Sequence, residues 1–192
     1  MKRKVRIGIN GLGRIGRQIF KLASRDNNIE IVGINEINPD IKNWAYTLNY
    51  DSIYGKLKNK VLTVENKLIF NSQEIYTSFV KDINKIPIEK WDIDILIDCT
   101  GVLQNVINSR KLIKNKKVKK VLITHSPKEV DFTMILGVNE DLYLDDKHNV
   151  IASSICDATA IAPVTKLLND LFKIKNGYVT TLHPWLSYQN LM

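Results

Sequence analysis

A cysteine and a histidine near the end of the sequence are the side chains best suited to covalent chemistry. Cys156 follows the apolar segment 149–155 and begins a segment with helical periodicity. The dipole and free amides at a helix N-terminus favour a thiolate, which is nucleophilic near neutral pH. His183 ends the apolar segment 177–183, and an imidazole exchanges protons near neutrality. On residue type and spacing alone, a packed thiol and a hydrogen-bonded strand-end histidine remain the simpler interpretations.

The segment KVRIGINGLGRIGRQIF, residues 4–20, contains three glycines at a spacing that suits a dinucleotide. Gly11 permits a tight turn, Gly13 lets the backbone approach a pyrophosphate, and Gly16 lets a helix pack closely against a strand. The amides at the helix start then meet the phosphates. A lone glycine pattern is weak evidence, but here an apolar strand precedes it, and an amphipathic helix and a second strand follow. The segment therefore predicts a dinucleotide site.

Glu36 lies at the end of the second predicted strand. Dinucleotide-binding folds use an acid there to accept hydrogen bonds from the adenosine ribose. A carboxylate at this position disfavours a 2′-phosphate, so the sequence predicts NAD rather than NADP as the cofactor. The alternative is that Glu36 merely caps a loop.

Apolar strand-like runs alternate with amphipathic stretches along the chain, which is typical of a parallel sheet covered by helices. We expect strands at 4–10, 29–35, 94–101, 119–124, 132–139, 149–155 and 177–183, short antiparallel strands within 60–79 that are joined at Glu65–Asn66, and helices at 14–24, 41–50 and 158–172. The last helix contains Pro163 in its first half.

The composition favours a globular protein of the cytoplasm. The 192 residues include two cysteines, carry a formal net charge of +8 and contain no apolar run long enough for a membrane helix. Two cysteines do not indicate a disulfide framework in a reducing compartment. The basic run from Arg110 to Lys120 is interpreted as a solvated helix end and turn, because no aromatic residues interleave with it for base stacking. Neither nucleic acid nor a membrane is therefore expected as a partner.

Several segments resemble those of glyceraldehyde-3-phosphate dehydrogenases, in the same order and at the same spacing. They are INGLGRIGRQIF, INEINPD, YDSIYGKL, DCTGV, VLIT, LGVN and CDATAIAPV. The resemblance extends over essentially the whole chain, and NGLGRIGR together with YDSIYGK makes it specific to this family.

The resemblance implies a two-domain oxidoreductase, usually a homo-tetramer. Residues 1–152 would form the NAD-binding domain, and residues 153–192 the incomplete beginning of the catalytic domain. The fold class expected is α/β, a Rossmann-type doubly wound parallel sheet followed by the first elements of an α+β catalytic domain.

By the same resemblance, the residues that contact NAD or line its cleft are Gly11, Gly13, Arg14, Ile15, Gly16, Glu36, Lys81, Thr100, Gly101 and Thr124. Lys81 stands where the family often has an arginine near the adenine, and Thr124 stands near the nicotinamide end. Cys99 takes a position that the family usually fills with a small residue, and we interpret it as a buried strand-end side chain.

The resemblance also decides between the alternatives for Cys156 and His183, because the family carries its catalytic residues there. Cys156 would attack an aldehyde carbon to give a thiohemiacetal. His183 would accept the hydroxyl proton as hydride leaves for the nicotinamide, and a thioester would remain. His125 and His148 have no such support, and the pair Asp145–Asp146 indicates a turn rather than a metal site.

The sequence departs from the family at the positions that bind substrate phosphate. The family places hydroxyl residues on both sides of the cysteine and threonines after the histidine, whereas this chain has Ile155, Asp157, Leu186 and Tyr188. An anionic Asp157 would repel a phosphate by about 1–4 kcal/mol at a few ångströms. We hypothesise a substrate aldehyde without a phosphate, with the thioester cleaved by water or another acceptor. The alternative is that Asp157 only caps the helix in a protein that has lost catalysis.

The chain is also shorter than the family pattern and stops soon after the predicted catalytic histidine. We therefore expect a fragment, a truncated gene product or an incomplete reading frame that lacks most of the catalytic domain. An NAD-binding module without turnover is the second functional hypothesis.

Overall fold

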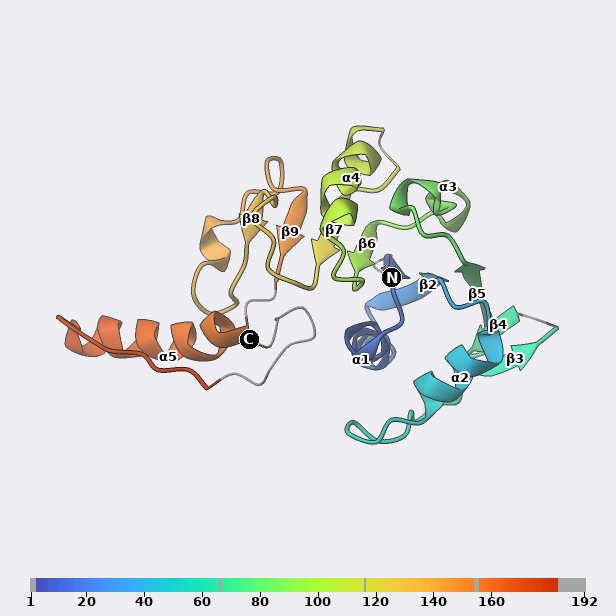
Figure 1. Cartoon of the computed structure of the whole chain (residues 1–192), viewed down its shortest axis with the longest axis horizontal. Coiled ribbons are helices and arrows are strands. Elements are labelled where there is room, and N and C mark those ends of the chain that lie inside the picture. Colours follow the sequence, from blue (N-terminus) through green and yellow to red (C-terminus); the bar gives the residue numbers. More distant parts are fainter. Residues whose placement is uncertain (1–2, 66, 116, 154–155, 183–192) are drawn as a thin grey trace, which may run out of the picture.

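The computed structural model describes residues 3–65, 67–115, 117–153 and 156–182, and a long sheet forms its centre (Figure 1). In chain order, the strands of this described part are β1 (Val5–Asn10), β2 (Ile29–Asn35), β3 (Leu62–Val64), β4 (Lys67–Phe70), β5 (Gln73–Ser78), β6 (Ile95–Asp98), β7 (Lys120–Ile123), β8 (Phe132–Thr133) and β9 (Val150–Ala152). The helices are α1 (Arg14–Ala23), α2 (Ile41–Asn49), α3 (Ile88–Trp91), α4 (Leu103–Lys114) and α5 (Cys156–Phe172), with short 3-10 turns η1 (Ile83–Lys85) and η2 (Glu140–Leu142).

The strand order across the sheet is β3-β4-β5-β2-β1-β6-β7-β9-β8. Neighbouring strands from β5 to β8 run parallel, whereas β3, β4 and β5 form an antiparallel edge. Strand β1 therefore lies in the middle, with β2 on one side and β6 on the other. This is the doubly wound, Rossmann-type arrangement that the sequence predicts.

Helices cover both faces of the parallel part of the sheet. In the view of Figure 1, α1 and α2 lie below the sheet, and α3 and α4 lie above it. The lower core contains the buried side chains of Phe20, Trp44 and Leu48, and the upper core contains those of Trp91 and Leu112. The parallel strands are buried from both sides, which explains their nearly continuous apolar sequences.

Helix α3, which the sequence did not predict, lies close to the sheet because two adjacent strands carry glycine beneath it. A Cβ on Gly33 of β2 would lie 2.4 Å from the ring of Trp91, and one on Gly8 of β1 would lie 3.3 Å from the same ring. The Trp91 side chain is only 1% exposed. The indole therefore occupies the space that side chains on β1 and β2 would otherwise fill.

The predicted strand 132–139 is wrong over most of its length, because only Phe132 and Thr133 pair as β8. The following residues form a turn in which Gly137 has a φ of 82°. The Asn139 side chain accepts a hydrogen bond from Ile135 N at 2.7 Å and donates one to Thr133 O at 2.9 Å. This turn uses backbone groups that a longer strand would have paired with a neighbour.

The segment 177–183 is not a strand over its described part, residues 177–182, and this prediction is also wrong. Within the described chain no strand pairs with it, and Tyr178 is fully exposed. A strand is stable only when its backbone groups pair with a neighbour. By contrast, α5 begins at Cys156 and contains Pro163, as expected.

Candidate functional site

The carboxyl ends of β1 and β6 lie side by side in the middle of the sheet. After β1 the chain crosses to β2 on one side, and after β6 it crosses to β7 on the other. In open α/β sheets this reversal opens a crevice outside the strand ends, where ligands bind. The predicted cofactor residues follow β1 (Gly11, Gly13, Arg14, Ile15, Gly16), β2 (Glu36), β5 (Lys81), β6 (Thr100, Gly101) and β7 (Thr124). The topology thus brings all of them to one edge.

Two glycines, one in the loop after β1 and one in the first turn of α1, are required by the protein itself. Gly11 has a φ of 92°, and a Cβ there would lie 3.1 Å from Thr100 Cγ2. A Cβ on Gly16 would lie 2.0 Å from Gly11 O, so α1 approaches the loop as closely as its backbone allows. These contacts agree with the tight turn and close helix packing predicted from the spacing.

Gly13 differs, because no atom of the described chain beyond Gly13 itself and its two chain neighbours lies within 4 Å of the position a Cβ would take there. Its φ of −65° and ψ of −166° suit any residue. Gly13 is also the N-cap of α1, where no side chain of the described residues caps the helix. The next two residues, Arg14 and Ile15, are exposed. Neither strain nor packing within the described chain explains this glycine, whereas the predicted approach of a ligand phosphate to the helix start would explain it.

The Glu36 carboxylate connects the loop after β1 to the loop after β2. It accepts hydrogen bonds from Leu12 N at 2.7 Å and from Asn38 N at 3.2 Å. Glu36 therefore lies against the glycine loop, where an adenosine ribose would meet it, and it also caps a loop. The two interpretations drawn from the sequence are compatible.

A buried polar network runs beneath this edge and was missed from the sequence. Asn35 Nδ2 donates to Asn10 Oδ1 at 2.7 Å, and Asn10 Nδ2 donates to Asp98 Oδ1 at 2.6 Å. Thr100 Oγ1 donates to the same carboxylate at 3.0 Å and accepts from Asn105 Nδ2 at 2.9 Å. The sequence feature that could have predicted the network is that each of three apolar strands ends in a polar residue: Asn10, Asn35 or Asp98.

Burial raises the pKa of Asp98 to about 6, although the hydrogen bonds from Thr100, Asn10 and Asn105 oppose the shift. The side chain is fully buried. The network joins the ends of β1, β2 and β6 and so fixes the bases of the loops that carry the predicted cofactor residues.

The other predicted cofactor residues, Lys81, Gly101 and Thr124, lie in the loops around this network. Thr124 N and Oγ1 both donate to Asp98 O, at 3.1 and 3.2 Å. Gly101 has a φ of 71° and is exposed. Lys81 is exposed and follows Val80, whose N and O both pair with the Asn35 side chain. These residues lie around the edge with their backbones anchored.

Cys99 lies half-buried just after β6. Burial, with a smaller contribution from the Asp98 charge, raises the pKa of its thiol to about 12. Because the thiolate is the reactive form, this shift disfavours nucleophilic chemistry at Cys99. This agrees with its interpretation as a strand-end packing residue.

Cys156 is the exposed first residue of α5, and the exposed Asp157 lies in the first turn of the same helix. The described residues of α5 include none that is buried, and Figure 1 shows the helix extending away from the sheet. His183 lies outside the described residues. So do Ile155, Leu186 and Tyr188, which carry the predicted loss of phosphate binding.

The segment YDSIYGKL is anchored to α1 rather than to the strand ends. Lys21 of α1 is buried and donates to Gly55 O at 2.7 Å. Asp51 accepts hydrogen bonds from Ile53 N and Tyr54 N at 2.9 Å each. In this structure the motif therefore supports the helix that carries the glycine loop.

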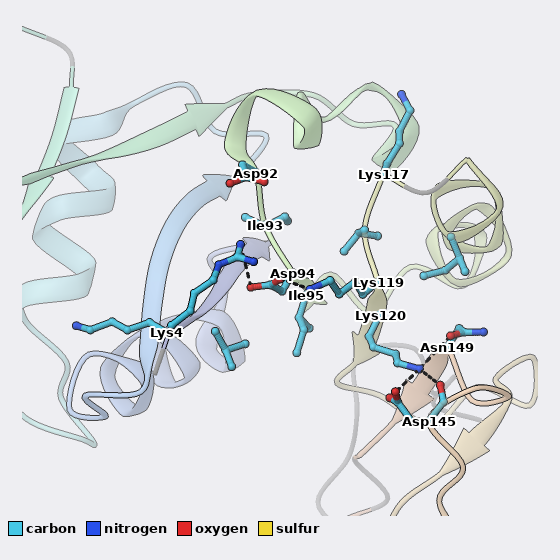
Figure 2. Close-up of a pocket in the computed structure, with 14 residues that line it drawn as sticks. Lys4, Asp92, Ile93, Asp94, Ile95, Lys117, Lys119, Lys120, Asp145 and Asn149 are labelled. Carbon is cyan, nitrogen blue, oxygen red and sulfur yellow. Dashed lines mark hydrogen bonds and ion pairs between the residues drawn. The ribbon is translucent and has the colours of Figure 1, made fainter. Parts of the chain in front are cut away.

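A cavity of about 900 Å³ lies at the opposite, amino-terminal edge of the sheet (Figure 2). Several of its charged groups pair with one another: Lys119 Nζ lies 2.7 Å from Asp94 Oδ1, and Lys120 Nζ lies 3.1 Å from Asp145 Oδ1. Figure 2 shows Lys117, from the basic run, pointing away from the cavity. The basic run therefore contributes mainly paired or solvent-facing cations.

The comparison with protein families identifies the family and the cofactor. The model of the family described as "Glyceraldehyde 3-phosphate dehydrogenase, NAD binding domain" matches residues 5–106, from the start of β1 into α4. The chain belongs to the glyceraldehyde-3-phosphate dehydrogenase family. NAD is therefore its cofactor, and the predicted Rossmann-type fold is confirmed. The open space at Gly13 and the uncapped start of α1 fit such a dinucleotide.

The similarity to curated relatives extends beyond residue 106 to nearly the whole chain. A glyceraldehyde-3-phosphate dehydrogenase of Priestia megaterium is 36% identical over 188 residues, which is 98% of this chain and 56% of the relative. The glyceraldehyde-3-phosphate dehydrogenase 2 of a Nostoc strain is 38% identical over 191 residues, with the same coverage. The chain thus spans little more than half the length of these relatives.

No group of three or more His, Cys, Asp or Glu side chains is arranged to hold a metal ion in the described part of the chain. Among the same residues, no helix is both long and apolar enough to cross a membrane.

Proposed function

We propose that NAD lies along the carboxyl edge of the sheet. The residues proposed to hold it are Gly11, Gly13, Arg14, Ile15, Gly16, Glu36, Lys81, Thr100, Gly101 and Thr124. The main support for this placement is Gly13. Its surroundings are open and its backbone is extended, so the fold does not require a glycine at this position. The adenosine half would lie near Glu36, and the phosphates would meet the first amides of α1.

The proposed reaction is oxidation of an aldehyde through a covalent intermediate on Cys156. The thiolate adds to the carbonyl carbon while the carbonyl oxygen takes up a proton from water, and the resulting thiohemiacetal then gives up its hydroxyl proton to His183. Bound NAD supplies the acceptor for the hydride that leaves the same carbon. The product on the enzyme is a thioester, which water or another acceptor cleaves to free Cys156. The exposed position of Cys156 at the start of α5 supports this role.

The proposed substrate class is an aldehyde without a phosphate group. Asp157 follows the nucleophile directly and is exposed at the start of α5, where its charge would face an incoming phosphate. Two like charges a few ångströms apart repel by about 1–4 kcal/mol near a protein surface. An uncharged aldehyde avoids this repulsion.

The same proposal covers the organisation of the chain. Residues 1–152 would form the NAD-binding domain, and residues 153–192 would begin the catalytic domain. We propose a cytoplasmic protein, and a homo-tetramer in a form that contains the whole catalytic domain. The absence of any buried residue in α5 among the described residues is consistent with a helix that belongs to a second domain.

NADH formation from paired aldehydes tests the substrate class. The chain should oxidise unphosphorylated glyceraldehyde at least as well as glyceraldehyde 3-phosphate, measured as kcat/KM. Asp157→Thr should improve the relative use of the phosphorylated aldehyde by at least about fivefold, because it removes the repelling charge. Cys156→Ser should abolish turnover but keep NAD binding. Strong activity that depends on the phosphate would contradict the proposal.

An NAD-binding module without turnover is the second candidate function. It is favoured by the way α5 leaves the sheet, because Cys156 is then not held against the cofactor edge by the described residues. Labelling of Cys156 by an electrophile separates the two functions. Protection by NAD together with an aldehyde supports catalysis, whereas a labelling rate that neither ligand changes supports the binding module.

A further inference from the structure

Asn176 and Gly177 lie in an exposed segment that follows α5. The helix ends at Phe172, and the next residue, Lys173, has a φ of 56°, which turns the chain out of the helix. The described residues from there to Leu182 form neither helix nor strand. Asn176 and Gly177 are both exposed. This asparagine–glycine pair is therefore in contact with water.

No hydrogen bond within the described chain restrains the two groups of this pair that could react with each other. Neither the Asn176 carboxamide nor Gly177 N has a partner there. No atom of the described chain, apart from Gly177 and its two neighbours, lies within 4 Å of the position a Cβ on Gly177 would take. Glycine also has the widest choice of φ and ψ. Rotation about single bonds can therefore bring Gly177 N to the side-chain carbon of Asn176.

The sequence contains a second asparagine–glycine pair, Asn10–Gly11, whose surroundings are the opposite. The Asn10 side chain is only 2% exposed, and its Nδ2 donates to Asp98 Oδ1 at 2.6 Å. Gly11 N donates to Asn35 O at 2.8 Å. Both groups that would have to react are therefore held by hydrogen bonds in the middle of the sheet. The same dipeptide is protected at one position and accessible at the other.

Asn71 is also exposed and precedes a small residue, Ser72, but its backbone is held in a closed hairpin. Asn71 and Ser72 have φ values of 49° and 63°, and the residues on either side, Phe70 and Gln73, pair across β4 and β5. This is the geometry of a tight two-residue hairpin turn. The Asn71 carboxamide also accepts a hydrogen bond from Asn59 Nδ2 at 2.9 Å. The turn restricts the rotations that a reaction between side chain and backbone needs.

We propose that Asn176 is a modification site, at which this chain deamidates faster than at Asn10 or Asn71. Asparagine is among the thermolabile residues, and this reaction needs only water as a co-reactant. Gly177 N gives its proton to water and forms a bond to Asn176 Cγ. The Cγ–Nδ2 bond breaks, and Nδ2 takes up a proton and leaves as ammonia.

Water then opens the resulting five-membered ring at one of its two carbonyl carbons. Opening at Cγ leaves an aspartate, and opening at the backbone carbonyl leaves an isoaspartate, in which the chain continues through the former side chain. The net change is one water consumed and one ammonia released, with no transfer of electrons. Either product adds a carboxylate and lowers the formal net charge of +8 by one. The isoaspartate also lengthens the backbone between Cys156 and His183.

Incubation of the full chain at mildly alkaline pH, followed by peptide mapping with mass spectrometry, tests the proposal. Aspartate and isoaspartate should accumulate at Asn176, while Asn10 and Asn71 stay amides. The rate at Asn176 should lie within about tenfold of that in a synthetic peptide of residues 172–182, because no described contact opposes ring closure. A slower rate, or faster reaction at Asn10 or Asn71, overturns the proposal. In urea, Asn10 should react about as fast as Asn176, and continued protection there would contradict the structural explanation.

Variants at the pair give a second readout, the rate at which the charge of the intact chain falls in ion-exchange chromatography. Gly177→Val should slow this loss at least about fivefold, because a branched side chain shields the nitrogen and restricts the backbone. Asn176→Gln should slow it as well, because its ring would need six members. Asn71→Gln is the matched control and should keep the parent rate. Loss of charge at the parent rate in Asn176→Gln, or an effect of Asn71→Gln as large as that of Asn176→Gln, overturns the proposal.

Discussion

Asp98 is the buried acid on which the ends of three strands converge. Its carboxylate accepts hydrogen bonds from Asn10 and Thr100, and burial raises its pKa to about 6. The unfolded chain has an ordinary aspartate pKa near ~3.9. Between these two values the folded protein holds a proton that the unfolded chain has released. Stability from this group is therefore complete at low pH and falls as the pH rises through about 6.

The replacement Asp98→Asn should remove this loss of stability. A pKa difference of about 2 corresponds to about 3 kcal/mol, so the variant should gain about that much relative to the parent between pH 4 and pH 7. Urea unfolding at several pH values measures the difference. A difference that stays constant with pH would show that Asp98 ionises no less readily in the folded chain than in the unfolded one.

Asp94, at the other edge of the sheet, provides a control because its pKa is shifted in the opposite direction. Burial by itself would raise its pKa, but the hydrogen bonds from Lys119 and from Arg6 N, with the charges of Lys119 and Arg3, lower it overall. A lowered pKa adds stability above the ordinary aspartate pKa, which is lost as the pH falls through the folded value. Asp94→Asn should therefore lose stability relative to the parent as the pH rises from below the folded pKa of Asp94 to about 5, and the difference should then stay level up to pH 7.

The loop after β1 and the first turn of α1 contain two glycines that are present for different physical reasons. Gly16 has protein backbone where a side chain would be, and Gly13 has open space. The first glycine serves the packing of a helix on a strand, and the second serves the proposed contact with the cofactor. The sequence shows the same residue type at both positions and does not separate them.

Paired alanine variants should separate stability from binding in this unit. Gly16→Ala places a Cβ 2.0 Å from Gly11 O and should lose about 1–3 kcal/mol of unfolding free energy or more. Gly13→Ala should stay within about 1 kcal/mol of the parent, because its backbone is extended and its surroundings are open. Its NAD affinity should nevertheless fall at least about tenfold. Denaturant unfolding and calorimetry measure the two effects, and a stable Gly16→Ala variant would contradict the packing argument.

At the scale of the whole molecule, the sheet and α5 differ in how they are stabilised. The sheet has two buried cores, one on each face, whereas the described residues of α5 include no buried side chain. Large apolar side chains of α5 are exposed, including Leu167 at 59% and Phe172 at 73%. The folding free energy of the described chain therefore resides in the sheet and its covering helices.

A chain that ends at Ser153 should keep the stability of the full chain within about 1 kcal/mol, since it retains both cores and the pairing of β9 with β7. Urea unfolding of the two chains at equal concentration makes the comparison. A loss of several kcal/mol would show that residues beyond 153 stabilise the sheet, and the proposed domain boundary would then be wrong.

Local patterns explain why much of the fold could be predicted from the sequence. The strands β1 and β2, the start of α1 at Arg14 and the start of α5 at Cys156 each depend on apolar periodicity and a few neighbouring residues. The prediction of a strand at 132–139 was wrong because a single side chain, that of Asn139, pairs with the backbone and replaces strand pairing. Apolar content alone does not show such a turn.

The sequence by itself determined the family, the cofactor and the doubly wound sheet, because these depend on residue types at short, regular spacing. Only the tertiary structure joined Asn10 to Asp98, which are 88 positions apart, and left the nitrogens of His125 without partners among the described residues. It also distinguished the open space at Gly13 from the close contact at Gly16. These features depend on strand register and on which atoms surround a side chain. Both arise when distant segments pack together, so no local pattern in the sequence encodes them.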